Sequence, residues 1–424
     1  MILLLSLVLW NLLFPFGALL FGFGFLVSRR RGLLKSLASE WPERMGLIPR
    51  AQRGSPVQRP LWIHAASLGE VNAALPLIEE LRAARRPLIL TSTNRAGVER
   101  ARALGLRAHL APLDWYPAVG AFLRRARPSA LILVETELWP QMITLASARG
   151  LALVIVNGAV SERSLRRYLL LRPVMKALLS RFRAIAAQTE EDAERFISLG
   201  APDSRVTAVG NIKYDLKPPS GRREASEALQ ALGWKGYPIF VAASTHPDEE
   251  DVVLEGFLKS LEKLPDLRLV IAPRHVERAS ELAANLQDRA IAFRSYSGVH
   301  APLPNNPRAL LVDVQGVLPQ FYGLAVASFV GGTLNALGGH NILEPAVEGS
   351  PVLFGPHLFK VRAPARALIE GGGGFEIRHA ADIAERLGAI SRHPEWRERS
   401  REAARSLAGA TSRTLRVLEN ALKA

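Results

Sequence analysis

Glycines, an asparagine and a glutamate stand together where an apolar run of this 424-residue chain ends, at Val330. The run is followed by Gly331-Gly332, by a second pair, Gly338-Gly339, and by His340-Asn341-Ile342-Leu343-Glu344-Pro345. A strand, a glycine turn and a helix N-terminus make a phosphate site, because free backbone N–H groups and the positive end of the helix dipole face the anion. An ordinary turn needs glycines as well, but the His-Asn-x-x-Glu-Pro continuation favours a ligand site.

Asn341 and Glu344 are three residues apart, so on the expected helix they share one face. We expect Asn341 to serve the phosphate, and Glu344 to accept hydrogen bonds from ribose hydroxyls. The spacing alone therefore predicts a phosphate-binding loop with a carboxylate for a neighbouring sugar.

Polar residues also follow the apolar runs in the first half of the chain. They are Ser67, Thr91, Glu135, Glu137 and Asn157. Such runs, alternating with helical sequence, predict a parallel sheet with helices on both faces, whose ligands bind beyond the carboxyl ends of the strands. Ser67 also has the capping-box spacing to Glu70, and the same helix N-terminus suits an anionic sugar or phosphate.

Glu43 is an acid within the basic stretch between Arg29 and Arg59. The neighbouring Arg44 is expected to lower the pKa of its carboxyl group and to keep it ionised. On spacing alone, a Glu–Arg pair on the surface of a short helix is favoured over a functional role.

Length and composition limit the class of protein. The chain is too long for one compact core, and with 48% hydrophobic and 22% charged residues it suits two globular domains. It has no cysteine, which excludes disulfides, cysteine–zinc sites and thiol nucleophiles. The net charge of +15 predicts a phosphate-bearing partner, which is nucleic acid, an anionic membrane surface or a phosphorylated substrate.

Residues 1–27 carry no charged side chain and are long enough to span the hydrocarbon core of a bilayer, which is about 30 Å thick. Arg29, Arg30 and Arg31 follow, and by the positive-inside rule they place the rest of the chain in the cytoplasm. A cleaved signal peptide would need a basic region before the apolar run and a small-residue cleavage site, and neither is present. We therefore expect an uncleaved membrane anchor over residues 1–27.

A second set of alternating strands and helices begins at Pro238, after the turn-rich Pro218-Pro219-Ser220-Gly221. The sequence thus predicts an α/β fold with Rossmann-like domains over residues 28–217 and 218–424, following the anchor over 1–27. The last helices are expected to pack back on the first domain. A cleft between two such domains is a natural ligand site.

A series of motifs runs in order along nearly the whole chain, and each is weak alone. Together they resemble one family, the Kdo transferases (3-deoxy-D-manno-octulosonic acid transferases) of lipopolysaccharide synthesis, which are membrane-anchored glycosyltransferases of the two-domain GT-B type. The motifs are Glu43-Arg44-x-Gly46, His64-x-x-Ser67-x-Gly69-Glu70, Glu135-Thr136-Glu137-x-Trp139-Pro140, Ser161-Glu162-Arg163-Ser164, Gly210-Asn211-x-Lys213-x-Asp215, Ser244-Thr245-His246, Pro273-Arg274-His275, and Gly331-Gly332 through Pro345.

The resemblance implies a reaction. Kdo would pass from CMP-Kdo to lipid IVA, the tetraacylated lipid A precursor, with inversion at the anomeric carbon and without a cofactor or metal ion. The enzyme would work on the cytoplasmic side of the inner membrane. Residues 28–217 would bind the acceptor and residues 218–424 the CMP-sugar.

The resemblance also implies a role for particular residues. Glu43 would be the general base, against the ranking from spacing alone, and Glu135 and Lys213 would stabilise the transition state. Acceptor contacts would come from Ser67, Gly69, Glu70 and Glu137. CMP would be held by Pro273, Arg274, Gln315, Gly316, Val317, Asn341, Ile342, Leu343 and Glu344.

The chain departs from the family pattern at three places. Asn157-Gly158-Ala159-Val160 stands where the family has Asn-Ala-Arg before Ser-Glu-Arg-Ser, so an arginine is missing. Val317 stands in place of a glutamate after Gly316, so only backbone contacts survive there. Pro247-Asp248 replaces the usual Glu-Gly after His246.

Three alternatives remain open. The first is another GT-B enzyme, either a UDP-sugar transferase or a nucleotide-sugar epimerase. The second is a membrane-tethered nucleic-acid-binding protein, suggested by the charge, although the chain has no stacking-aromatic or helix-turn-helix signature and we expect no nucleic-acid partner. The third is a dinucleotide dehydrogenase, which is disfavoured because no strand is followed by Gly-x-Gly-x-x-Gly.

Overall fold

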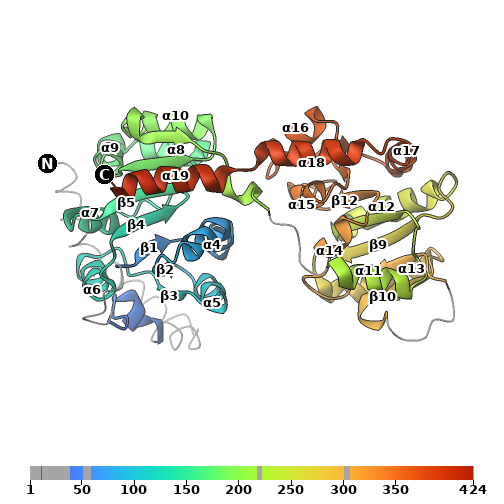
Figure 1. Cartoon of the computed structure of the whole chain (residues 1–424), viewed down its shortest axis with the longest axis horizontal. Coiled ribbons are helices and arrows are strands. Elements are labelled where there is room, and N and C mark those ends of the chain that lie inside the picture. Colours follow the sequence, from blue (N-terminus) through green and yellow to red (C-terminus); the bar gives the residue numbers. More distant parts are fainter. Residues whose placement is uncertain (1–10, 12–38, 51–58, 217–221, 300–305, 424) are drawn as a thin grey trace, which may run out of the picture. The chain divides into compact units, whose positions relative to one another are not determined.

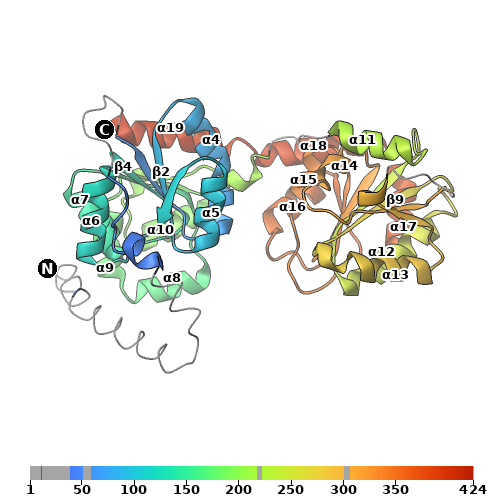
Figure 2. The same ribbon diagram turned by 90° about the horizontal axis from the view of Figure 1, so that it is seen from below.

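The computed structural model describes Asn11 and residues 39–50, 59–216, 222–299 and 306–423. The chain divides into two α/β units, one of Met1–Asp215 with Gly409–Ala424 and one of Leu216–Ala408 (Figures 1 and 2). The anchor predicted over residues 1–27 lies, apart from Asn11, outside the described residues. Within the described part of the chain, no helix is long and apolar enough to cross a membrane.

The first unit is built on a parallel sheet whose described strands have the order β3-β2-β1-β4-β5-β6-β7. This is the doubly wound arrangement predicted from the alternation of strands and helices. The edge strand β3 was not predicted, because its sequence of Arg107-Ala108-His109-Leu110 contains no apolar run. The strands are β1 (Leu61–His64), β2 (Leu88–Ser92), β3 (Arg107–Leu110), β4 (Ala130–Val134), β5 (Ala152–Gly158), β6 (Ala184–Ala187) and β7 (Val206–Ala208).

Alternate residues of the central strands enter two separate cores. In β4, Leu131 and Leu133 pack on one face of the sheet, and Ile132 and Val134 on the other. The first face is covered by α6 (Tyr116–Ala126), α7 (Pro140–Ala148), α9 (Arg172–Leu179) and α10 (Glu190–Ser198). The second face is covered by α3 (Leu68–Ala73), α4 (Leu75–Ala83), α5 (Arg95–Ala103) and α19 (Ala410–Lys423). The unit also contains α8 (Glu162–Leu169), η1 (Asp203–Arg205) and η2 (Ile212–Tyr214).

The C-terminal helix α19 packs on the first unit (Figure 1). Leu418 and Ala421 are buried in the same core as the residues of α4. The start of the helix is held by the Asp215 carboxylate, which accepts hydrogen bonds from the N–H groups of Gly409 and Thr411. The last helix is therefore tied to the point at which the chain leaves the first unit.

The second unit repeats the plan with a parallel sheet of order β10-β11-β9-β8-β12-β13-β14. Phe240 and Ala242 of β8 enter one core, and Val241 and Ala243 enter the other. The strands are β8 (Ile239–Thr245), β9 (Arg268–Pro273), β10 (Phe293–Ser295), β11 (Ala309–Leu311), β12 (Ala327–Val330), β13 (Val352–Phe354) and β14 (Gly374–Glu376). The helices are α11 (Arg222–Ala231), α12 (Pro247–Ser260), η3 (Val276–Arg278), α13 (Ala279–Asp288), η4 (Tyr296–Gly298), α14 (Pro319–Tyr322), α15 (Leu343–Val347), α16 (Arg362–Glu370), α17 (Ala380–Ile390) and α18 (Trp396–Leu407).

Each sheet has a point at which the strand order reverses, between β1 and β4 in the first unit and between β8 and β12 in the second. The loops that leave neighbouring strands there turn to opposite faces, so the carboxyl ends of these strands border a crevice in which doubly wound proteins bind ligands. Of the polar residues predicted from the sequence, Ser67 follows β1, and Glu135 and Glu137 follow β4. Thr91 and Asn157 lie instead within β2 and β5.

Candidate active site

Three carboxylates follow the two strands at the reversal point of the first unit. Glu70 lies in the first turn of α3, which begins after β1, and its Oε2 accepts a hydrogen bond from Ala66 N at 2.8 Å. Ser67 Oγ accepts from Glu70 N at 3.2 Å, which confirms Ser67 as the cap of α3, and donates to Glu70 Oε1 at 3.0 Å. The Glu70 side chain accepts from Ala66 N and not from Ser67 N, so only the first half of the predicted capping box forms. Gly69 lies in the same turn.

The pKa of the Glu70 carboxyl is raised to about 7, chiefly by burial. The charges of Glu137 and Glu135 act in the same direction, and the hydrogen bonds from Ala66 and Ser67 oppose them. Burial also raises the pKa of Glu137, whose Oε2 accepts a hydrogen bond from Trp139 Nε1 at 2.7 Å. The electrostatic influence of Glu135 and Glu137 on Glu70 places the three groups close together, as their positions at neighbouring strand ends require.

Lys213 follows β7, the edge strand at the end of the sheet opposite β3, and its side chain contacts this cluster. Its Nζ lies 2.8 Å from Glu135 Oε1, although the two residues are 78 positions apart. Glu135 itself has a φ of +61°, a conformation that is uncommon for a residue other than glycine and that clusters at functional sites. The structure thus joins the two residues to which the resemblance assigns transition-state stabilisation.

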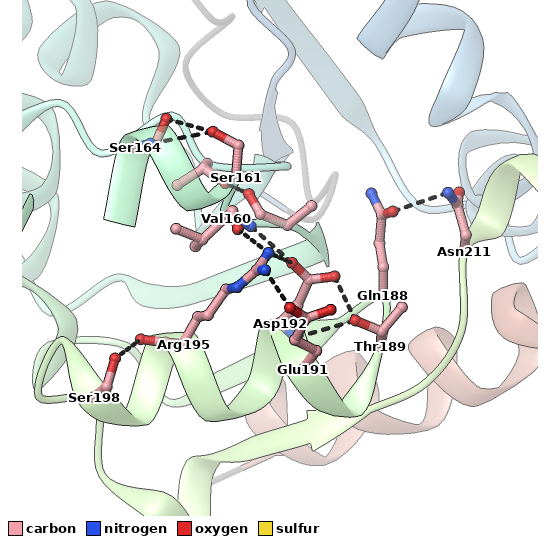
Figure 3. Close-up of polar contacts among 12 residues, drawn as sticks. Val160, Ser161, Ser164, Gln188, Thr189, Glu191, Asp192, Arg195, Ser198 and Asn211 are labelled. Carbon is pink, nitrogen blue, oxygen red and sulfur yellow. Dashed lines mark hydrogen bonds and ion pairs between the residues drawn. The ribbon is translucent and has the colours of Figure 1, made fainter. Parts of the chain in front are cut away.

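Side chains at the ends of β5 and β6 form hydrogen bonds with the segment that carries Lys213. Asn157 is fully buried with a φ of +54°, and its Oδ1 accepts a hydrogen bond from Ile212 N at 3.0 Å. Gln188 Oε1 accepts from Asn211 Nδ2 at 2.9 Å (Figure 3). The segment that carries Lys213 is therefore held across the carboxyl ends of two strands before it reaches Glu135.

The loop between β5 and α8, where the sequence departs from the family pattern, is braced by α10. Asp192 Oδ1 accepts a hydrogen bond from Val160 N at 2.9 Å, and Arg195 Nη1 donates to Val160 O at 2.6 Å (Figure 3). Ser161 caps α8 by accepting a hydrogen bond from Ser164 N at 3.2 Å. A methyl group on Gly158 would lie 2.9 Å from the Phe196 ring, so the packing in this chain has no room for the usual alanine.

Glu43 lies in a helical segment over residues 39–44, and its carboxylate reaches the end of β3. Oε2 accepts a hydrogen bond from Leu110 N at 2.7 Å, and Oε1 lies 2.9 Å from Arg102 Nη2 and 3.5 Å from His109 Nδ1. The expected pairing with Arg44 is wrong, because Arg44 donates to Glu40 at 2.8 Å instead.

The Glu43 carboxyl is nevertheless held in its ionised form. Burial raises its pKa, but the Leu110 N–H, His109 and Arg102 more than offset this, and the pKa lies below its usual range. Leu110 ends the edge strand, three strands from β4, so roughly 14 Å separates the two strand ends at about 4.8 Å per strand. Glu43 therefore lies on the same edge of the sheet as Glu135 but outside the carboxylate cluster.

The second unit has a pocket of about 310 Å³ at the carboxyl ends of its strands. Among the residues predicted to hold CMP, Pro273, Arg274, Gln315 and Gly316 line it, whereas Val317 and residues 341–344 do not. Ser244, another residue with an uncommon positive φ (+53°), also contributes. The remaining lining residues are Ala272, Val276, Val312, Val314 and Leu318.

The phosphate site predicted at Gly331-Gly332 is wrong in one respect, because the N–H groups of the turn are not free. The Glu249 carboxylate, fully buried at the start of α12, accepts hydrogen bonds from Gly332 N (2.8 Å), Thr333 N (2.9 Å) and Leu334 N (2.9 Å). It also accepts from His246 N at 3.2 Å. A side chain of the protein thus fills the place expected for a ligand's anion.

The expected helix over residues 341–344 is also shorter than predicted. α15 begins at Leu343, so Asn341 precedes it, although Asn341 Nδ2 still donates to Glu344 Oε1 at 3.1 Å. Ile342 and Leu343 are only 1% exposed, so neither side chain is presented to a ligand. Burial raises the pKa of the Glu344 carboxyl, while the Asn341 hydrogen bond and the charge of Arg274 oppose it.

Histidines near Arg274 were not among the predicted site residues. His246 Nε2 lies 2.9 Å from His340 Nε2, and the His275 ring centroid is 6.3 Å from that of His246. Two of the motifs found in the sequence, Ser244-Thr245-His246 and Pro273-Arg274-His275, end in histidine, and these could have indicated the histidines as site residues. Among the described residues, no group of three or more histidine or acidic side chains is arranged to hold a metal ion.

Comparisons with known proteins agree with the motifs. Residues 39–216 match the family model described as 3-deoxy-D-manno-octulosonic-acid transferase (kdotransferase). The chain is 35% identical to a 3-deoxy-D-manno-octulosonic acid transferase of Haemophilus influenzae over 84% of each chain. It is 34% identical to that of Bordetella pertussis over 87% of this chain and 89% of the relative.

A comparison of structures identifies the fold. The UDP-GlcNAc 2-epimerase of Neisseria meningitidis matches with a TM-score of 0.56 and 14% identity, over 86% of this chain and all of that one. At this identity the match shows a shared fold and no more. The two parallel sheets with this arrangement are a GT-B-like α/β fold, as the sequence predicted.

The raised pKa of Glu70 predicts that stability depends on pH. Between about pH 4.5 and 7 the folded protein holds a proton that the unfolded chain has lost, so this carboxyl destabilises the fold increasingly as the pH rises through that range. Glu70→Gln, which resembles the protonated form and does not titrate, should raise the melting temperature more at pH 8 than at pH 5, measured by scanning fluorimetry. The exposed Glu80→Gln is the control. An equal effect of Glu70→Gln at both pH values would contradict the prediction.

Proposed function

The chain belongs to the Kdo transferase family, and from this premise we propose that it transfers Kdo from CMP-Kdo to lipid IVA with inversion at the anomeric carbon. The observation that carries the proposal is the ion pair of Glu135 and Lys213 at the reversal point of the first sheet. It joins two motifs of the family in one constellation of opposite charges, which suits a reaction in which charge develops on both the sugar and the leaving group.

Glu43 is the proposed general base. Its ionised carboxylate removes the proton from the acceptor hydroxyl as the hydroxyl oxygen attacks the ketosidic carbon of Kdo. The bond from that carbon to the phosphate oxygen breaks, and its electron pair leaves with CMP. Attack on the side opposite the leaving group inverts the anomeric carbon. Glu135 stabilises the positive charge that builds on the sugar ring.

A positive side chain is proposed to stabilise the leaving group. Arg274 lines the pocket of the second unit, and no acidic group lies within 4 Å of its guanidinium among the described residues. Arg274 supplies a cationic donor for a departing monophosphate, so we propose that no metal ion is required. The first unit then binds the acceptor, with Ser67, Gly69, Glu70 and Glu137 on that side, and the second binds CMP.

A membrane location is part of the proposal. The uncharged residues 1–27 and the arginines that follow support an anchor in the inner membrane with the two units in the cytoplasm.

The exposed end of α8 supports contact with the lipid surface. Leu169, Leu170 and Leu171 are 41%, 83% and 57% exposed, and no residue of α8 is buried. Arg163, Arg166, Arg167 and Arg172 flank them, which is the composition of a helix that lies on anionic lipid.

Transfer can be tested with the protein in detergent, CMP-Kdo, lipid IVA and EDTA, with the products read by mass spectrometry. The wild type should add Kdo to lipid IVA, whereas UDP-GlcNAc in place of CMP-Kdo should give no product. Glu43→Gln should lower the transfer rate about a hundredfold or more while CMP binding persists, because only the base is lost. Glu40→Gln, on the same helical segment, is the matched control and should stay active.

The absence of any Kdo adduct with the wild type would overturn the proposed function. A Glu43→Gln protein as active as Glu40→Gln would leave the reaction standing and remove Glu43 as its base.

The leucines at the end of α8 should contribute to membrane binding. Replacing Leu169, Leu170 and Leu171 by serine removes the exposed apolar side chains without opening a core, so binding to anionic vesicles should fall about tenfold or more. Flotation of a variant lacking residues 1–27 isolates this contact from the anchor. Ile369→Ser, an exposed apolar residue of α16, is the control. Unchanged flotation of the triple variant would contradict a role for this surface.

A further inference from the structure

Two histidines form a hydrogen-bonded pair at the reversal point of the second sheet. His246 follows β8 and His340 follows β12, and their Nε2 atoms are 2.9 Å apart. The ring planes differ by only 14° and the centroids are 5.2 Å apart, so the rings meet edge to edge. One ring must donate and the other accept, which requires that at least one imidazole is neutral.

The pair lies among positive charges. Arg274, His275, Arg278 and Lys360 all exert a positive field on one or both rings. Arg278 is paired with Glu250 at 3.0 Å and with Glu281 at 2.9 Å. By contrast, neither Arg274 nor Lys360 has an ion pair among the described residues.

The two acidic groups near the pair are already engaged in other contacts. Glu249 faces His246, but its carboxylate already accepts four backbone hydrogen bonds. Glu344 faces Arg274 and is hydrogen bonded to Asn341. The charged groups that act on His340 are thus all basic, whereas His246 also faces the negative charge of Glu249, and the His340 side of the pair suits an anion.

The surroundings of the pair disfavour the protonated form of both rings. Burial, together with the charges of Arg274, His246, Lys360 and His275, lowers the pKa of His340 to about 4. Burial also lowers the pKa of His246, where the charge of Glu249 works in the opposite direction and those of His275, Arg278 and Arg274 work in the same one. A bound anion would reverse the local field, so the rings would bind a proton more readily.

We propose that His246 and His340 form a phosphate subsite that takes up a proton when the nucleotide binds. The identity of the nucleotide, CMP, rests on the proposed function, whereas the pair and its surroundings do not. The neutral pair has two N–H groups, and one of them is used between the rings. One added proton, taken from solvent, gives a third N–H group, so two N–H groups become available to phosphate oxygens.

This subsite suits the charge that develops during transfer. When the bond between the ketosidic carbon and the phosphate oxygen breaks, its electron pair stays on the phosphate, which changes from one negative charge to two. The imidazolium N–H groups donate to the dianion, and the acceptor's proton goes to Glu43. The pair therefore holds more charge complementary to the product phosphate than to the donor ester, which favours bond cleavage.

Calorimetry can count the proton. CMP is titrated into the full-length protein in detergent at pH 7, in two buffers of different ionisation enthalpy, so that the difference in observed heat gives the protons taken up. CMP titrates near pH 6 itself, so wild type is compared with His246→Gln and His340→Gln, which keep a polar group but do not titrate. We expect about half a proton or more in the wild type, and a clear reduction in both variants.

Affinity gives a second readout. Wild-type CMP affinity should rise as the pH falls from 8 to 6, because protonation accompanies binding, and this rise should shrink in both variants. At pH 6.5 the variants should bind CMP about tenfold more weakly. Cytidine, which has no phosphate, should bind the wild type and both variants equally and without proton uptake. His393→Gln, a histidine paired with Glu395 outside the pocket, is the matched control.

Further ligands separate the possible outcomes. Sulfate, a dianion that does not titrate in this range, should give the same histidine-dependent uptake, and free Kdo should not. CMP binding without histidine-dependent uptake would overturn the subsite and leave the proposed function intact. Uptake with sulfate but no preference for CMP over UMP would support the subsite and contradict the proposed donor. Uptake with Kdo alone would place the sugar carboxylate at the pair and overturn the phosphate assignment.

Discussion

One buried carboxylate sets the geometry at the reversal point of the second sheet. Glu249 accepts four backbone N–H groups, one from the end of β8 and three from the turn after β12. The two backbones are so close that a methyl group on Gly331 would lie 2.2 Å from Ser244 O. Because His246 supplies one of the four N–H groups, and His340 N donates to Gly331 O, the same contacts bring the two imidazoles together. The N–H groups of Gly332, Thr333 and Leu334 are engaged by Glu249, so side chains nearby are left to meet the charge of a ligand at this turn.

The two units supply opposite chemistry at corresponding places. The first unit gathers carboxylates, and their surroundings separate their pKa values: Glu43 is held ionised by donors and cations, while burial and like charge keep Glu70 partly protonated near neutral pH. Such a separation distinguishes a group that can take a proton from one that can donate a hydrogen bond. The second unit gathers Arg274 and histidines. Hydroxyl chemistry thus suits the first unit and phosphate binding the second.

The sequence predicted what depends on local pattern. The apolar run expected before Glu135 is the strand β4 (Ala130–Val134), and the spacing of Ser67 and Glu70 predicted the cap that Ser67 makes on Glu70 N. What it missed depends on residues far apart in the chain. The turn at Gly331 was predicted to bind a phosphate. The carboxylate that accepts hydrogen bonds from its N–H groups belongs to Glu249, which lies more than 80 positions earlier in the chain and could not be recognised from the local pattern. Likewise, the residues that hold Glu43 ionised lie about 60 positions away on α5 and β3, and not next to it.

Hydrogen–deuterium exchange with and without CMP would test most directly the central claim, that the nucleotide binds the second unit while the base lies in the first. The account predicts that CMP slows exchange at the carboxyl ends of β8 and β9, at residues 244–246 and 273–275, and in the segment after β12, at residues 340–344. It predicts no change at residues 39–44 and 107–110, which surround Glu43. Protection confined to the first unit, or absent from the segments around His246, Arg274 and His340, would contradict it.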